Sequence, residues 1–131
     1  MKRDEAGIAV LGFAWVVSVS LILASGCGPG PEKAYQEALT VLTKLSEDAT
    51  DSGLRGDALL ALARANAPSA LTRLKTGLQS SQEDVAFKSA QGLGELGGKE
   101  AAAALRDAAP AVKASFVLAQ IALDLNRMGD P

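Results

Sequence analysis

Cys27 is the residue best suited to covalent chemistry, and it is the only cysteine among 131 residues. It follows an uncharged, mostly apolar run over residues 7–24 and comes directly after the small pair Ser25-Gly26. Two of the first three residues are basic. A charged start, an apolar stretch and small residues, in that order, are typical of an export signal. The lone thiol would therefore lie at a membrane surface.

Residues 23–27, Leu-Ala-Ser-Gly-Cys, resemble the lipobox of bacterial lipoprotein precursors. The resemblance implies that the Cys27 sulfur is thioether-linked to a diacylglyceryl group and that a peptidase cuts between Gly26 and Cys27. We therefore expect residues 1–26 to be a removed signal peptide, leaving the protein lipid-anchored on the extracytoplasmic side of a bacterial cell membrane. The alternative is an uncleaved signal-anchor helix, because the apolar run nearly reaches the roughly 20 residues that span a bilayer.

The composition excludes several kinds of site. The chain has no histidine, so the commonest metal ligand and general base are missing. A single cysteine allows neither an internal disulfide nor a four-thiolate zinc site. A formal charge of −2 provides no basic field for nucleic acid. We expect no metal, no other cofactor, no nucleic-acid partner and no enzyme activity.

Residues 27–31 are expected to form a lipidated tether, since Gly-Pro-Gly-Pro follows the cysteine. Glycine bends freely and proline does not extend a helix beyond its first turn, so four such residues span on the order of 15 Å when extended. The rest of the chain, 32–131, has the size of one domain.

Residues 32–131 are predicted to be all-α, because alanine and leucine dominate and the breaks fall at Gly, Pro, Ser or Asn clusters. Ser81, with Asp84 three residues later, is a candidate helix cap, and Gly97-Gly98 is a candidate stop. Six helices are expected: 32–47, 53–65, one beginning at Pro68, 82–96, 99–108, and one from Pro110 to about Met128.

The helices repeat with a period of 31 to 32 residues. ALTVL at 38–42 recurs as ALTRL at 70–74, and Leu54 aligns with Val85. Residues 85–105 resemble the short HEAT repeats first associated with phycobilisome lyases, through Leu93-Gly94-Glu95-Leu96-Gly97 and the following Glu100-Ala101. This resemblance implies a short right-handed α-solenoid of helical pairs, with half repeats at each end, whose second helices line one surface.

Two surfaces are candidates for binding a partner. By the repeat offset, Lys75 and Arg106 should stack on adjacent second helices roughly 10 Å apart and, with Arg73 nearby, pair with an acidic segment. The alternative is that all three are ordinary solvated residues.

The last helix is the other candidate surface, because two apolar stripes leave it only a narrow polar edge. The first stripe comprises Ala114, Leu118, Ile121, Leu125 and Met128. The second comprises Val112, Phe116, Ala119 and Leu123. The polar edge comprises Lys113, Gln120, Asp124 and Arg127. Either the preceding two helices splay to cover both stripes, or Phe116 and Leu123 form a docking face.

Members of the resembled family mostly hold protein partners, and a minority act in chromophore attachment. The sequence therefore favours a non-catalytic, membrane-anchored interaction scaffold that holds an envelope protein. A structural lipoprotein that associates only with itself is the alternative. A lyase-like enzyme accessory comes third, because it would rest on fold alone.

Replacing Cys27 by alanine should block both processing and firm membrane attachment. Intact-mass analysis of the wild-type protein should find a chain that begins at an acylated Cys27. The mature protein should then show tyrosine-only fluorescence, because Trp15 is the only tryptophan. An unmodified chain beginning at Met1 would instead favour the signal anchor.

Overall fold

The computed structural model describes residues 30–129, and within this range the chain is helical with no strand. The helices are α2 (Pro31–Asp48), α3 (Ser52–Arg64), α4 (Ala70–Leu78), α5 (Glu83–Leu96), α6 (Gly98–Ala108), the short 3-10 helix η1 (Ala109–Ala111) and α7 (Ser115–Arg127). The predicted signal peptide and Cys27 lie outside the described residues. Among the helices of this range, none is long and apolar enough to cross a membrane.

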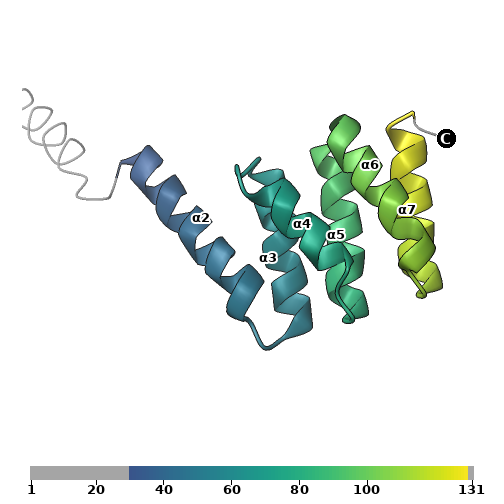
Figure 1. The fold of residues 1–131 in the computed structure, drawn as a ribbon. Helices are drawn as coiled ribbons and strands as arrows, with labels where there is room; N and C mark the ends of the chain where they lie inside the picture. Colours follow the sequence, from purple (N-terminus) through teal and green to yellow (C-terminus); the bar gives the residue numbers. More distant parts are fainter. Residues whose placement is uncertain (1–29, 130–131) are drawn as a thin grey trace, which may run out of the picture. The chain divides into compact units, whose positions relative to one another are not determined.

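The expected all-α solenoid is confirmed. From Tyr35 onward the chain forms one compact unit. In this unit α3, α5 and α7 lie side by side, while α4 and α6 follow α3 and α5 as their second helices (Figure 1). The core lies between these layers and is built mainly from Leu62, Leu74, Leu93, Leu105, Val117 and Ile121. Two helical pairs are thus complete, and α2 and α7 are half repeats.

Helix α2 packs more loosely than the other helices of the unit, and Figure 1 shows it inclined away from α3. Polar contacts link it to the following helices. The Tyr35 hydroxyl donates to the Ala65 carbonyl oxygen at 2.8 Å, and Arg73 forms an ion pair with Glu47 at 2.5 Å. On its inner side Leu39 and Leu42 are only partly buried.

Residues with positive φ end the first helix of each pair. Gly97 (φ 69°) and Gly98 (φ 83°) stop α5, as the sequence predicted. Asn66 (φ 49°) takes the equivalent position 31 residues earlier, after α3. Asparagine is among the few side chains that tolerate this conformation, so it replaces the glycine here.

Two predicted helix starts were wrong. Helix α4 begins at Ala70, because the positive φ of Asn66 is followed by a turn that contains Pro68. Helix α7 begins at Ser115, because Pro110 lies in η1 and the backbone then extends through Ala114 (ψ 117°).

The predicted cap at Ser81 was also wrong. Gln82 is the residue before α5, and its backbone N–H donates to the Ser80 hydroxyl at 3.1 Å. Asp51 provides the side-chain cap of α3 instead, accepting the Leu54 N–H at 2.7 Å.

Glycines allow α5 to approach both of its neighbours. A Cβ at Gly92 would lie 2.6 Å from Leu74 Cδ2 and 3.4 Å from the Ala63 Cβ. A Cβ at Gly94 would overlap the Asp124 carboxyl group of α7. Gly92 thus makes room for Leu74 of α4, and Gly94 makes room for Asp124 of α7.

We predict that Gly94→Val lowers the free energy of unfolding by about 1–3 kcal/mol, because the added side chain must displace Asp124. Thermal or denaturant melting measures the loss. The control is the same substitution combined with Asp124→Ala, which removes the overlapping group. An equal loss in both backgrounds would show that this contact is not the cause.

Candidate interaction surfaces

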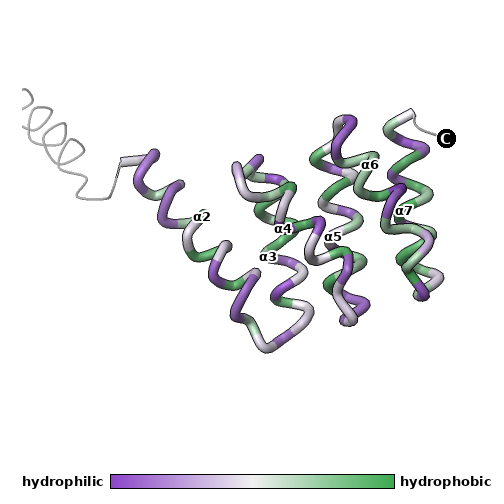
Figure 2. Tube along the Cα trace, in the orientation of Figure 1, coloured by the Kyte–Doolittle hydropathy of each residue, from purple (hydrophilic) through white to green (hydrophobic). Residues whose placement is uncertain are grey.

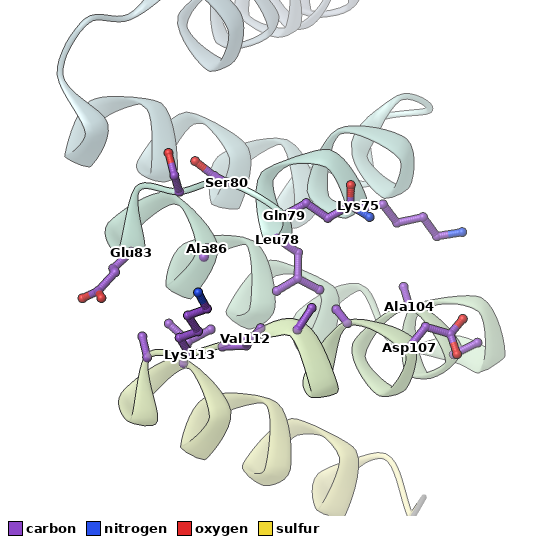
Figure 3. Close-up of a pocket in the computed structure, with 16 residues that line it drawn as sticks. Lys75, Leu78, Gln79, Ser80, Glu83, Ala86, Ala104, Asp107, Val112 and Lys113 are labelled. Carbon is purple, nitrogen blue, oxygen red and sulfur yellow. The ribbon is translucent and has the colours of Figure 1, made fainter.

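A hollow of about 750 Å³ lies between α4, the start of α5, α6 and the turn before α7 (Figure 3). Apolar side chains line it, among them Leu78, Ala86, Ala104, Val112 and Val117. Charged residues of both signs, Lys75, Glu83, Asp107 and Lys113, line it as well. An apolar floor with a mixed rim suits an apolar side chain of a peptide segment.

The three predicted basic residues do not surround this hollow together. Lys75 is exposed on its rim, and Figure 3 shows its side chain extending away from the floor. Arg106 is exposed on the last turn of α6 and does not line the hollow. Whether Lys75 and Arg106 bind an acidic segment stays a prediction.

Arg73 is committed to contacts within the protein. Its Nη1 lies 2.5 Å from Glu47 Oε1, and its Nε donates to the Ser69 hydroxyl at 3.3 Å. It lines a second hollow of about 750 Å³ between α2, α3 and α4, which also contains Arg55. The sequence analysis missed Arg55, whose Nη2 donates to the Ala49 carbonyl at 2.8 Å. An acidic partner would have to compete with Glu47 for Arg73.

Ion pairs join α3 to α5 at the repeat spacing. Arg64 donates to both carboxylate oxygens of Glu95, at 2.7 and 2.9 Å, and Lys88 lies 2.9 Å from Asp57. The hydrogen bond from Arg64 is the main cause that lowers the pKa of Glu95. These pairs are partly solvated, so they fix the alignment of the helices more than they stabilise the fold.

The face of α7 that is turned inward differs from the predicted one. Val117, Ile121 and Asp124 are buried, whereas Leu118, expected on the inward stripe, is 36% exposed. Val117, Ile121 and Asp124 share one face of α7, and Gly94 of α5 leaves room for Asp124 on that face.

Two stripes of α7 stay at least partly exposed. The outer stripe consists of Phe116, Ala119 and Leu123. The edge stripe consists of the exposed Leu118 and Ala122 and the half-buried Leu125, which packs against the core. Phe116 is 43% and Leu123 51% exposed, which confirms that part of the predicted second stripe stays uncovered. The Phe116 ring lies 5.6 Å from the ring of half-buried Phe87 on α5. Figure 2 shows apolar residues on successive turns of α7.

Asp124 was predicted on the polar edge of α7, but its side chain is only 1% exposed. Its carboxylate accepts a hydrogen bond from Gln120 Nε2 at 2.8 Å and lies 3.6 Å from Arg127 Nη1. Burial raises the pKa of this carboxyl above its ordinary value, and the contacts with Gln120 and Arg127 oppose that shift. Its spacing from Val117 and Ile121, at i−7 and i−3, was the signal that could have placed it inside.

A family model of HEAT repeats matches residues 39–126, which includes both helical pairs and most of α2 and α7. No match was found among curated proteins or among solved structures.

The raised pKa of Asp124 predicts a pH-dependent contribution to stability. A carboxyl whose pKa is higher in the folded than in the unfolded protein stabilises the fold below its ordinary pKa near 3.8 and loses that contribution as the pH rises through the raised value. Asp124→Asn should therefore unfold with less dependence on pH, and the variant should gain stability relative to wild type as the pH rises from 4 towards 7.

Chemical denaturation of both proteins across about pH 4 to 7 measures the difference in their free energies of unfolding. The contributions of carboxylates that both proteins share cancel in this difference. A difference that does not change with pH, or that grows in the opposite direction, would contradict the burial of the Asp124 carboxyl.

Proposed function

Because this chain belongs to the HEAT-repeat family, we propose that it is a non-catalytic scaffold, lipid-anchored at the outer face of a bacterial cell membrane, that holds another envelope protein. HEAT repeats generally mediate contacts between proteins. Their stacked helices present extended surfaces on a rigid framework, which suits holding a partner. The proposal contains three parts: the partner site, the anchor and the absence of catalysis.

The outer stripe of α7 is the observation that carries the partner site. Phe116 and Leu123 are about two helical turns apart on one face, and about half of each side chain is exposed. Phe87 of α5 extends this apolar surface through its contact with Phe116. At about 25 cal/mol per Å² of apolar surface removed from water, a partner that covers the stripe gains several kcal/mol. The matching partner surface is an apolar groove or helix face.

The anchor rests on the sequence of residues 23–27 and on the distance to the folded part. Helix α2 begins at Pro31, so only three residues, 28–30, separate Cys27 from the first helix. Extended, they span on the order of 10 Å. A scaffold tethered so closely would hold its partner near the bilayer surface. The partner is therefore an envelope protein rather than one far from the membrane.

The absence of catalysis rests on the family, because HEAT-repeat proteins are typically non-catalytic. A chromophore-lyase role would rest on the fold alone, which does not carry function.

The proposal predicts that Phe116→Ser and Leu123→Ser each weaken partner recovery at least tenfold, a loss of about 1.4 kcal/mol, while the protein keeps its helicity. The measurement is quantitative co-purification from detergent-solubilised membranes. Thr72→Ala is the control, because Thr72 is also an exposed helical residue but lies on α4, away from the outer stripe.

Circular dichroism melting of the same variants separates binding from folding. Loss of folding together with loss of the partner would show that α7 is core and not a docking surface. Full recovery of the partner with both α7 variants would move the partner site to the surface around Arg73, Lys75 and Arg106.

A further inference from the structure

The edge stripe of α7 exposes positions that are buried one repeat earlier. Val85, Ser89 and Gly92 on the inward side of α5 correspond to Val117, Ile121 and Asp124 on α7, an offset of 32 residues. The contacts between neighbouring first helices follow the same repeat. Gly92 of α5 lies next to Ala63 of α3, and Asp124 of α7 lies next to Gly94 of α5.

The same offset relates the edge stripe to core residues of α5. Ala86 is 6% exposed and Ala90 is fully buried, whereas the equivalent Leu118 is 36% exposed and Ala122 is also exposed. On α5 these positions belong to the buried core. On α7 the described residues leave them partly uncovered.

The other end of the unit exposes the complementary positions. Ala38 of α2 is exposed, whereas the equivalent alanines of the other second helices, Ala70 and Ala101, are buried. On α3, Leu54 is 47% exposed, whereas the equivalent Val85 on α5 is 2% exposed. In the complete repeats these positions pack on a first helix. Ala38 and Leu54 have no such helix among the described residues.

The two ends therefore supply the two halves of one repeat. Among residues 30–129, α2 is a second helix without a first, and α7 is a first helix without a second. We propose that α7 of one copy docks onto α2 and α3 of a second copy, in a head-to-tail contact that completes the missing repeat. The edge stripe would then meet Ala38 and Leu54, as the equivalent residues of α5 meet their neighbours.

The charges of the two ends are complementary. Helix α2 carries four acidic residues and two lysines, and α3 adds Arg55, Asp57 and Arg64, so this end has a net charge of −1. Helix α7 and the turn before it carry Lys113, Arg127 and Asp124, a net charge of +1, with Asp124 buried 3.6 Å from Arg127. An acidic end and a basic end attract each other, while two copies of the same end repel. This favours a head-to-tail contact over a symmetric contact between two α7 helices.

Small side chains at the centre of both surfaces permit a close approach. Ala38 and Ala122 are equivalent to Ala101 of α6 and Ala90 of α5, which are both buried within one helical pair. The contact is heterologous, because different surfaces of the two copies meet, so it builds rings or chains rather than a closed symmetric dimer. The inference rests on neither the lipid anchor nor the outer stripe, which stays uncovered in such an assembly.

The test uses one blocking variant at each end of the full-length chain. Ala38→Glu blocks the α2 end and leaves α7 intact, and Ala122→Glu does the reverse. Both residues are exposed and helical, and glutamate is a good helix former, so both variants should fold. Light scattering after size exclusion, corrected for bound detergent, measures the mass of each protein.

The wild-type chain should form species larger than a monomer, with a mass that rises with concentration, and each variant alone should be a monomer. An equimolar mixture of the two variants should form a one-to-one dimer that grows no further, because it has one intact α7 end and one intact α2 end. Thr72→Glu, which adds the same charge on exposed α4, should associate like the wild type.

A monomeric wild-type chain would overturn the proposal. So would a dimer that persists in Ala38→Glu and is lost in Ala122→Glu without recovery in the mixture, because that pattern belongs to a symmetric contact between α7 helices. Recovery in the mixture also controls for folding, since an unfolded variant could not restore the partner's association. Neither outcome bears on whether Phe116 and Leu123 hold an outside protein.

Discussion

The close approach of α5 to the first helices on either side of it is the constraint on which the rest of the structure depends. Gly56 of α3 and Gly94 of α5 lack the side chains that would meet Lys88 of α5 and Asp124 of α7 and keep these helices apart. The leucines of the second helices then fill the space behind these crossings, with Leu74 and Leu105 fully buried. Without the two glycines the layer would open and those leucines would lose their neighbours.

In this kind of stacking a helix buries its apolar residues fully only if another helix packs on each side of it. Helix α5 has both and buries nearly all of its apolar residues, whereas α2 and α7 each have one. Repeat proteins normally carry a polar outer face on the terminal repeats. Here α2, α3 and α7 keep Val41, Leu54, Leu118 and Leu123 exposed. The surfaces available for association thus follow directly from the packing that forms the core.

Features that rest on local chemistry were predictable from the sequence. The repeat spacing, the stop at Gly97 and the packing role of Gly94 all follow from residue type and period. Helix starts were less predictable, because Pro110 fits a first turn equally well in an α-helix and in η1. The predicted start of the third helix at Pro68 was wrong for a similar reason, because Pro68 lies in the turn before α4.

Contacts between distant residues were beyond the sequence. Nothing near Arg73 in the chain indicates that it pairs with Glu47, which is 26 residues away. Asp124 was placed at the surface because it is charged, although its spacing from Val117 and Ile121 is that of the inward face. The buried carboxylate is tolerated at this position because Gly94 leaves room for it and Gln120 donates a hydrogen bond to it. The predicted lipid attachment at Cys27 lies outside the described residues and stays a prediction.

Amide hydrogen exchange, measured on the full-length chain at low and high protein concentration, tests most directly whether the terminal helices are the unsatisfied elements of this solenoid. At low concentration the amides of α5 should exchange slowest, and those of α2 and α7 should exchange much faster. At high concentration α2 and α7 should gain protection while α5 changes little. Protection of α2 and α7 equal to that of α5 in the dilute protein would contradict the account, because both helices would then already be fully packed.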